Sequence, residues 1–577
     1  MRVKEKDAFE GLKRVARRYS ENFEFAVVAA AYSVLTAIKK GTRFPLPSLD
    51  EIFKGEEDAP SFVREFIKKS IGNHWSEYQA IPVMFDEDRL VDFFANEAIG
   101  LLANARQVCV PDASVHALAA GLLDLDSKDR VCDLDCKIGS FVNTAWFRLW
   151  DVSGSDEGLE VTGVSTSATS AALTYIVSHA NGVNATIRNA DIFRPEETVC
   201  DKVFITPPFG VRTQAINMVA AQQSLGAALP GFPEIRLSTA DWVYAARALS
   251  LTAEGGRTVV ALPLFALSGS QHEAYRRYFI SKKLVEGVVT IPQGFLHGTA
   301  AGFSLVILKR GSDAVKFVDG GEYVKKVGNA SKIDVERLLK DYRNLADYEA
   351  VTTKSLDKVY ENECNLAPEF YLGEDLNYTN AMRFGDLVSS IERGVRISVN
   401  GWTEVESATP TSVKKLAYKN IVDGIIGEDL LSLTTVPDGG ESGVLNDGDL
   451  LVSRIGLPFK IAVVDGHFDK TLVADENVII CRMDGNKERA YYLRAFLESK
   501  RGQTWLARLS SGAVSKAIAS KGLAKIPVPK FDEESIRKIA TDLQRATILV
   551  KENQKRLVES LATMKNIFNN LNSNGVN

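Results

Sequence analysis

The segment best suited to chemistry is Thr206-Pro207-Pro208-Phe209, which lies at the end of an apolar run that starts at Lys202. Two consecutive prolines cannot continue a central strand, because neither has a backbone N–H to donate to the sheet. They fix a stiff loop whose backbone offers carbonyl acceptors, and such acceptors suit an incoming amino group. The aromatic ring that follows can stack on a planar base. We therefore expect a reaction loop at the carboxyl end of a strand.

Two acidic segments are suited to binding a ligand beside this loop. Asp133 ends a short β-rich run and leads through a turn containing Gly139 into a helical stretch. Open α/β sheets bind adenosine-bearing ligands where a strand passes through such a turn into a helix. Asp191 precedes an apolar pair, and its carboxylate could accept the amine of an adenine ring. The alternatives are a plain strand-to-helix turn at Asp133 and a turn or helix-capping role for Asp191.

The elements that must position these segments alternate between short β-rich runs and longer helical stretches from about residue 106 to 330. Such alternation predicts an α/β fold with a parallel, doubly wound sheet, and it places the segments above at strand ends, where ligands bind. Helices are expected at Ala171–Ala180 and Thr239–Thr252. The expected strands are Arg130–Asp133, Leu159–Val164, Lys202–Thr206, Thr258–Pro263, Leu284–Ile291 and Ser304–Lys309.

Domain boundaries are predicted where this pattern changes. Residues 1–105 indicate a helical domain, residues 106–330 the α/β domain, and residues 331–380 a helical connector. Residues 381–530 contain short strands between Gly and Asp turns, which indicates a second, α+β domain. Residues 531–577 contain one long helix over 533–572 with an intermittent apolar stripe, made by Ile539, Leu543, Val550, Leu557, Leu561, Met564 and Phe568.

The composition excludes several classes of protein. With 577 residues, 45% hydrophobic and 25% charged, the chain is expected to be globular rather than disordered, collagen-like or a pure coiled coil. Its net charge is -5, but basic residues outnumber acidic ones from Arg501 onward, which indicates one basic surface. The cysteines lack paired CxxC spacing and no secretory signal precedes them, so we expect a cytoplasmic protein without disulfides or a metal site. No apolar run approaches the ~20 residues of a membrane span.

Together these strings resemble the N6-adenine DNA methyltransferase family, especially the modification subunits of type I restriction–modification systems. The family's catalytic motif, NPPF or NPPY, matches at Pro207, Pro208 and Phe209. Its cofactor motif, DPxCGxGGF, matches at Asp133, Cys136, Gly139 and Phe141. Further matches, which extend the resemblance over roughly residues 1–375, are Val110-Pro111, Gly255–Pro263, Ile291–Phe295 and Asn365–Pro368.

The resemblance implies a Rossmann-like core and a specific reaction. The core would bind S-adenosyl-L-methionine and transfer its methyl group to the 6-amino group of adenine in double-stranded DNA, without a metal. The target adenine would leave the duplex and stack on Phe209, while its amino group donates to Thr206 and the Pro207 carbonyl. The cofactor-binding residues implied in this way are Pro111, Asp133, Cys136, Gly139, Phe141, Ser165 and Asp191.

The C-terminal part resembles one target-recognition half of a type I specificity subunit. Gly448–Arg454 is similar to its GDILVSR string, and Ile526–Pro529 and the long helix follow in that module's order. The resemblance implies a domain that reads a DNA sequence, with Arg454, Arg501, Lys516 and Lys521 as phosphate-contacting candidates. One recognition half in place of the usual two implies a homodimer through the long helix, and restriction or specificity subunits are further candidate partners.

The chain departs from the family's motifs at four positions. Lys137 and Ser140 replace glycines of the cofactor loop, and Ser165 replaces a ribose-binding Glu. Thr206 stands where the family has Asn or Asp, and its hydroxyl is a poorer acceptor, which predicts slower transfer. Two alternatives stay open: a catalytically degenerate DNA-binding or partner subunit, and a cytosine-4-amino methyltransferase, whose motif carries Ser before Pro-Pro. A fused nuclease is disfavoured, because residues 1–105 contain no convincing PD…ExK arrangement.

Overall fold

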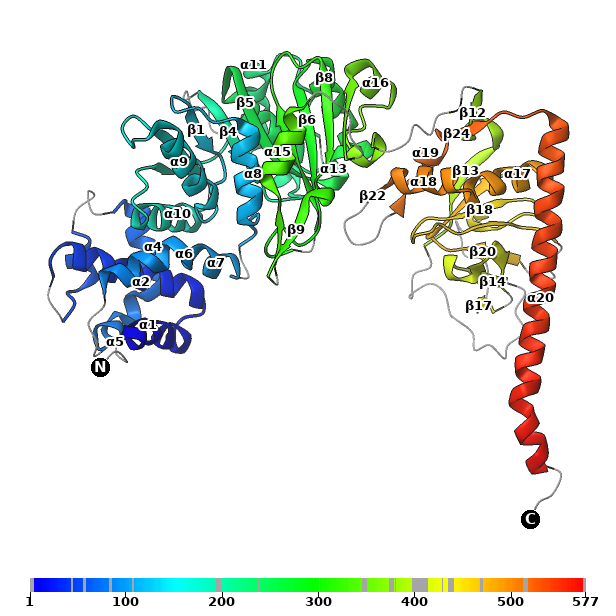
Figure 1. Cartoon of the computed structure of the whole chain (residues 1–577), viewed down its shortest axis with the longest axis horizontal. Helices are drawn as coiled ribbons and strands as arrows, with labels where there is room; N and C mark the ends of the chain where they lie inside the picture. Colours follow the sequence, from blue (N-terminus) through cyan, green and yellow to red (C-terminus); the bar gives the residue numbers. More distant parts are fainter. Residues whose placement is uncertain are drawn as a thin grey trace. The chain divides into compact units, whose positions relative to one another are not determined.

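The computed structural model divides into two compact units, Met1–Gly373 and Glu374–Asn577, which are treated separately (Figure 1). Within the ranges that the structure describes, no helix is both long enough and apolar enough to cross a membrane. These ranges are residues 5–42, 45–54, 59–81, 86–105, 108–193, 199–236, 238–299, 301–328, 330–344, 350–372, 378, 380–396, 413–427, 429–433, 441–466, 471–511 and 517–573.

The first unit begins with a bundle of helices. The central helix of the bundle is α2, which is buried on nearly every face. Its sequence is rich in alanine and valine, and a helix that is apolar all round is stable only when other elements cover it. The covering includes α10 (Ala168–Ala180), so the bundle shares a hydrophobic core with the α/β part. The helices are α1 (Glu5–Tyr19), α2 (Phe23–Lys39), α3 (Leu49–Ile52), α4 (Ser61–Ile71), α5 (Trp75–Gln79), α6 (Glu87–Asn96) and α7 (Ala98–Ala103).

The α/β part is built on a sheet of nine described strands in the order β11-β8-β6-β7-β5-β4-β1-β2-β3 (Figure 1). The strands from β3 to β5 are parallel, which confirms the Rossmann-like prediction. They are β1 (Arg130–Asp133), β2 (Glu160–Ser165), β3 (Thr186–Asn189), β4 (Cys200–Ile205) and β5 (Thr252–Pro263). The others are β6 (Val285–Ile291), β7 (Phe303–Leu308), β8 (Ala314–Asp319) and β11 (Val351–Ser355).

Two strands of this predominantly parallel sheet run in the opposite direction. β7 runs antiparallel to both β5 and β6, and β11 runs antiparallel to β8. The chain between β6 and β7 is too short for the crossover of a dozen or more residues that a parallel neighbour requires. The two strands therefore form a hairpin, and β7 lies between β5 and β6.

Helices cover both faces of this sheet, and alternating side chains of each central strand enter two different cores. On β5, Val259 and Ala261 pack with α8 (Ala113–Leu123) and α9 (Ser140–Ser153). Val260 and Leu262 pack on the other face with α11 (Met218–Ala228), α12 (Asp241–Ser250) and α14 (Glu273–Ser281). A strand covered on both faces is apolar at every position, which explains the uninterrupted run in the sequence.

The segment predicted as a helical connector, residues 331–380, differs from that prediction. Its described part contains α15 (Val335–Arg343) and α16 (Leu356–Glu361), but β10 (Ala330–Ile333) pairs with β9 (Val324–Val327) and β11 joins the main sheet. β11 has the sequence VTTKS, in which β-branched residues favour a strand over a helix. The segment is therefore part of the α/β unit rather than a separate linker.

The second unit combines small sheets with helices. A four-stranded sheet is formed by β13 (Ser390–Arg393), β21 (Val478–Arg482), β18 (Leu450–Ser453) and β19 (Ile461–Val463). A three-stranded sheet is formed by β17 (Leu431–Leu433), β14 (Val413–Leu416) and β20 (Thr471–Ala474). Short pairs are β12 (Ala381–Arg383) with β24 (Pro527–Pro529), β15 (Ile421–Val422) with β16 (Ile425–Ile426), and β22 (Ser510–Ser511) with β23 (Ala517–Ile518).

The helices of this unit are α17 (Lys487–Glu498), α18 (Lys500–Leu509), α19 (Ser520–Leu523) and α20 (Glu533–Ser573). The long helix predicted over 533–572 corresponds to α20 (red in Figure 1). The first half of α20 packs on the domain, where Gln544 Nε2 donates to Asp465 Oδ2 at 2.9 Å and Arg494 Nη1 donates to Thr547 Oγ1 at 2.9 Å. Farther along, its large apolar side chains are exposed, among them Leu557 and Val558.

Candidate active site

The loop that follows β1 has the conformation that a glycine-rich motif would adopt. Gly139 has φ +81°, and a Cβ added there would lie 3.2 Å from the Thr174 Cα of α10, so this position requires glycine. Lys137, which stands at a family glycine, also has a left-handed φ of +47°. α9 begins directly after Gly139, and the buried Ser140 Oγ at its first residue has no hydrogen-bond partner within the described chain.

Asp133 lies at the end of β1 beneath this loop. Its side chain is buried, and burial raises its pKa well above the usual range, with the nearby charge of Asp135 adding to the effect. The Asp135 backbone N–H points to Asp133 Oδ1 at 3.4 Å. Asp133 is thus placed to organise the loop rather than to face solvent.

Asp135 contacts two other residues of this site, and it was not predicted as a site residue from the sequence. Lys137 Nζ lies 2.5 Å from Asp135 Oδ2. Ser165, at the end of β2, directs its Oγ toward Asp135 Oδ1 at 3.4 Å. Asp133, Asp135, Lys137 and Ser165, together with Asp191, are called the strand-end cluster below.

Asp191 belongs to this group through Tyr244 of α12. Burial raises the pKa of Tyr244 to about 12, and the carboxylates of Asp135, Asp191 and Asp241 lie near enough to raise it further. Asp191 Oδ1 also accepts the backbone N–H of Phe193 at 3.0 Å, the turn role considered as its alternative. The loop after β1, the loop after β3 and the start of α12 therefore present carboxylates around one phenol.

Cys136 and Phe141 lie inside the domain. The Cys136 carbonyl accepts the Thr174 hydroxyl at 3.1 Å, and its own N–H donates to the Val164 carbonyl at 2.9 Å. Phe141 stacks on Phe204 of β4 with ring centroids 4.1 Å apart. Both residues fit a role in holding the loop in place.

Pro111 lies on a segment that pairs with the end of the β6–β7 hairpin. It forms an isolated bridge with Leu296, the Asp112 N–H donates to the Phe295 carbonyl, and the His297 N–H donates to the Val110 carbonyl, both at 2.9 Å. Two of the distant family-like strings are therefore side by side. Burial raises the pKa of Cys109, and the charge of Lys137 partly offsets this effect. Cys109 therefore lies near the loop after β1, which carries Lys137.

The Pro-Pro loop leaves β4, the neighbour of β1, and the Leu134 N–H donates to the Phe204 carbonyl at 2.9 Å between them. Pro207 is buried and Pro208 is exposed. Phe209 is half-buried with its ring centroid 5.9 Å from that of Phe303. Thr206 is 3% exposed, and its Oγ1 finds no hydrogen-bond partner among the described residues.

Asp241, at the start of α12, supports this loop and was not recognised from the sequence. Its Oδ1 accepts the Gly210 N–H at 3.2 Å, immediately after Phe209. Its Oδ2 lies 3.9 Å from His272 Nε2 and has no hydrogen bond to any described residue. Burial raises the pKa of Asp241 and lowers that of His272 to about 4, so at pH 7 the imidazole is neutral.

The DNA-contacting candidates of the second unit are only partly described. Arg454 follows β18, and its carbonyl accepts the N–H of Ile518 in β23 at 2.9 Å. The guanidinium of Arg501 lies 4.7 Å from the ring centre of Tyr378. Lys516 lies outside the described residues, and Lys521 lies on α19 with its side chain outside the description. Arg393 and Arg396 were missed: both approach Glu476, and the charge of Arg393 acts on Arg454.

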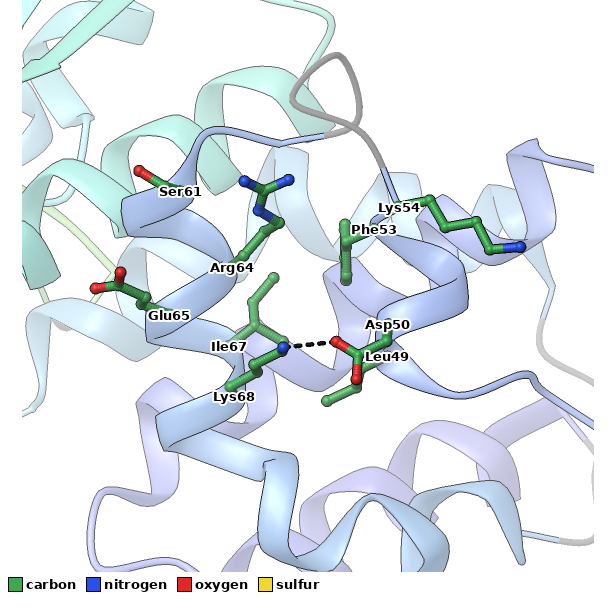
Figure 2. Close-up of a pocket in the computed structure, with 9 residues that line it drawn as sticks. All are labelled: Leu49, Asp50, Phe53, Lys54, Ser61, Arg64, Glu65, Ile67 and Lys68. Carbon is green, nitrogen blue, oxygen red and sulfur yellow. Dashed lines mark ion pairs between the residues drawn. The ribbon is translucent and has the colours of Figure 1, made fainter.

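A separate pocket of about 390 Å³ lies between α3 and α4 of the helical bundle (Figure 2). Asp50 and Lys68 form an ion pair of 2.5 Å across it, and both side chains are largely exposed. None of its lining residues belongs to a motif singled out in the sequence. The chemistry-bearing residues are instead grouped at the strand ends.

The strand ends fit a positively charged, hydrogen-bonding ligand such as S-adenosylmethionine. Asp191 supplies negative charge, and Asp135 forms an ion pair with Lys137. Ser140 Oγ and Thr206 Oγ1 are buried hydroxyls without a partner in the described part of the chain, and Gly139 permits close packing of the loop. Buried polar atoms without partners are rare in folded proteins and call for an explanation such as a ligand. Among the described residues, no group of His, Cys, Asp or Glu is arranged to hold a metal ion.

Comparisons with known proteins find one family pattern in the sequence. The sequence pattern of the N-6 DNA methylase family matches residues 103–377. The methylase subunit of the type I restriction enzyme MpnII from Mycoplasma pneumoniae is 27% identical over 147 residues, which is 24% of this chain. The match covers 27% of that subunit, so the chain spans about a quarter of the length of this curated relative.

Solved structures resemble the fold. A nuclease-deletion mutant of the Type ISP restriction-modification enzyme LlaGI, in complex with a DNA substrate mimic, aligns with 94% of this chain and 65% of its own at 11% identity and a TM-score of 0.52. The methyltransferase subunit of a type I restriction-modification system from Streptococcus thermophilus aligns with 63% of this chain and 98% of its own at 15% identity and a TM-score of 0.48. At 11% identity the likeness to the LlaGI structure concerns the fold alone.

Proposed function

We propose that the chain transfers a methyl group from S-adenosyl-L-methionine to the 6-amino group of adenine in DNA, and the match of residues 103–377 to the N-6 DNA methylase family supports this proposal. The reaction would mark one sequence as part of a restriction–modification or phage-defence system in the cytoplasm. The second unit would select that sequence, and restriction or specificity subunits are the proposed partners.

The observation that carries the proposal is the buried hydroxyl of Thr206, which has no hydrogen-bond partner among the described residues and stands in front of two prolines on the strand next to the strand-end cluster. An acceptor left open in this position suits the amino group of a substrate base. Two strands that neighbour each other in the sheet thus hold the proposed base site and the proposed cofactor site side by side.

The residues of the loop have separate parts in the proposed mechanism. The target base must leave the duplex, because its amino group cannot be reached while it is stacked. Phe209, half-buried against Phe303, gives the flipped base a stacking surface. Thr206 Oγ1 and the Pro207 carbonyl accept the amino hydrogens, which favours positive charge developing on nitrogen and aligns its lone pair.

The strand-end cluster would hold the cofactor beside that base. S-adenosylmethionine, when bound, supplies an electrophilic methyl group on a positively charged sulfur. Asp135 and Asp191 favour the positive charges of this ligand, and Asp133 keeps the loop in position from below. Asp241 anchors the Gly210 N–H, which fixes the direction in which Phe209 and Pro208 leave β4.

In the second unit, Arg454 and Arg501 would contact phosphates, and Lys516 and Lys521 would join them. Phosphate contacts fix the register on the duplex, while other side chains read the base edges. Arg393 and Arg396 extend the proposed basic surface next to Arg454.

Transfer to the 4-amino group of cytosine is a second candidate, because Thr206 offers a hydroxyl as a serine would. Single-molecule sequencing of DNA from a methylation-free host that expresses this chain separates the two, since it reports the modified base and its sequence context. We expect N6-methyladenine at one recurring sequence. N4-methylcytosine would select the second candidate, and DNA without modification would support a catalytically degenerate subunit.

We further propose that α20 joins two copies of the chain. Val550, Leu557, Leu561 and Met564 are exposed and spaced by alternating four and three residues from 557 onward, which is the seam of a coiled coil. Light scattering should show a dimer for the full chain and a monomer for a chain ending at Gln554, which keeps the packed half of α20. The matched substitution Leu557→Glu with Leu561→Glu should also give monomers, whereas a full-length monomer at micromolar concentration would contradict the proposal.

A further inference from the structure

Lys137 is an unusual residue for its position. Its φ of +47° lies in the left-handed region, where a residue with a side chain is disfavoured and glycine is not. Its side chain nevertheless remains at the site, 20% exposed, with Nζ 2.5 Å from Asp135 Oδ2. A lysine kept in a conformation that suits glycine indicates that its ammonium group has a use in the loop.

The partner of this lysine is held from two sides. Asp135 is 11% exposed at its side chain, with Lys137 at one carboxylate oxygen and the Ser165 hydroxyl 3.4 Å from the other. The two opposite charges neutralise each other while no ligand is present, so neither is left uncompensated in a mostly buried place. They also present a positive and a negative group side by side on the same loop.

We propose that Lys137 and Asp135 form a two-charge receptor for the α-amino-acid end of the cofactor. This inference rests on the proposed function and names the residues that would grip one part of its ligand. The amino-acid end of S-adenosylmethionine is a zwitterion, with a carboxylate and an ammonium on one carbon. The Lys137 ammonium binds the carboxylate and the Asp135 carboxylate binds the ammonium, so the internal ion pair is exchanged for two ion pairs with the ligand.

The residues around Lys137 and Asp135 support their assignment as the receptor for the amino-acid end of the cofactor. The hydroxyls of Ser165 and Ser140 flank the loop, and the Ser140 Oγ is buried without a partner in the described residues, so a polar ligand group has a further donor there. The Asp191 carboxylate lies near Tyr244, where it suits a positive group of a cationic ligand. If Lys137 only occupied space in the site, its removal would strengthen the binding of S-adenosylmethionine instead of weakening it.

The test is calorimetry on the full chain with two probes, S-adenosylmethionine and its decarboxylated form, which lacks only the carboxylate. The wild type should bind S-adenosylmethionine at least about tenfold more tightly. Lys137→Met, which removes the charge, should lose that preference through weaker binding of S-adenosylmethionine, with little change for the decarboxylated probe. Lys137→Gly, which also removes the backbone strain, should behave in the same way, and Lys137→Arg should restore the preference.

Lys128→Met, at an exposed lysine before β1, serves as the matched control and should leave both affinities unchanged. Thermal unfolding of each variant identifies any that fails to fold, in which case Lys137→Gly and Lys137→Arg still decide the question. An unchanged preference in Lys137→Met, or tighter binding of S-adenosylmethionine, would overturn this inference alone. A folded wild type that binds neither probe would overturn the proposed function, and the inference with it.

Discussion

Replacing Thr206 with asparagine is expected to raise the rate of adenine methylation between about 30-fold and several hundred-fold. Removing one well-placed hydrogen-bonding group from a transition state costs roughly 2–4 kcal/mol, and each ~1.4 kcal/mol is a factor of ten in rate. Thr206 Oγ1 is short and set on a β-branched carbon, whereas an amide oxygen reaches farther and accepts better. Thr206 Oγ1 is buried and has no hydrogen-bond partner among the described residues. The side chain at position 206 is therefore the one that would accept the hydrogen bond from the base.

The measurement is the initial rate of tritium transfer from labelled S-adenosylmethionine to DNA. Thr206→Val is the matched control, because it keeps the shape and removes the acceptor, and it should be slower than the wild type. A wild type that methylates adenine rapidly and is slowed by Thr206→Asn would contradict this account of the loop. If cytosine were the substrate, Thr206→Ser would be tolerated and Thr206→Asn would be harmful.

Replacing Arg482 with methionine is expected to destabilise the four-stranded sheet of the second unit by about 3–5 kcal/mol. Arg482 Nη1 lies 2.6 Å from Asp449 Oδ2, and Nη2 lies 2.7 Å from Glu392 Oε2. Asp449 is 2% exposed, so removal of the arginine leaves a buried carboxylate without its counter-charge. The guanidinium also donates to the carbonyls of Val444 and Ser442, which would lose their donors.

Amide hydrogen exchange in β18 and β21 measures this effect locally within the full chain. Exchange through opening of the sheet should become faster by a factor of about a hundred or more. Arg393→Met is the matched control, because the Arg393–Glu476 pair is partly exposed and such pairs contribute only about 0–1 kcal/mol. Equal exchange in the two variants would show that the Arg482 network is not what holds the sheet together.

The predictable part of the fold is the part that is covered on both faces. β1 occupies Arg130–Asp133 as predicted, and β4 and β7 differ from their predicted bounds by one or two residues, because short runs rich in apolar residues mark central strands. β3 was missed, since an edge strand with the sequence TIRN is half-exposed and carries no apolar run. The antiparallel direction of β7 depends on the length of a connection and on pairing partners, which periodicity does not report.

The candidate site, like the fold, has a part that could be predicted from the sequence and a part that could not. Asp133, Ser165, Asp191 and Thr206 come together because each follows or ends a strand of one parallel sheet, and their order along the chain was enough to group them. The ion pair of Lys137 and Asp135 could not be foreseen, because it depends on a left-handed turn.

Asp241 and Tyr244 were missed for another reason. They reach the strand ends by the packing of α12 against the sheet. Asp241 lies 31 residues after Gly210, whose N–H it accepts. The residue string Ala240-Asp241-Trp242 at the start of a helix has no feature that separates a supporting carboxylate from an ordinary first-turn acid. Packing of this kind is visible only in three dimensions.

The most direct test of the central claim is methyl transfer by the purified full chain. DNA from a methylation-free host is incubated with tritium-labelled S-adenosylmethionine and digested to nucleosides, which are then separated. We predict label in N6-methyldeoxyadenosine, and loss of that label when Phe209→Ala removes the stacking surface of the flipped base. Label that stays absent from every nucleoside, although the chain binds S-adenosylmethionine and DNA, would contradict the claim that the Thr206-Pro207-Pro208-Phe209 loop is an active site.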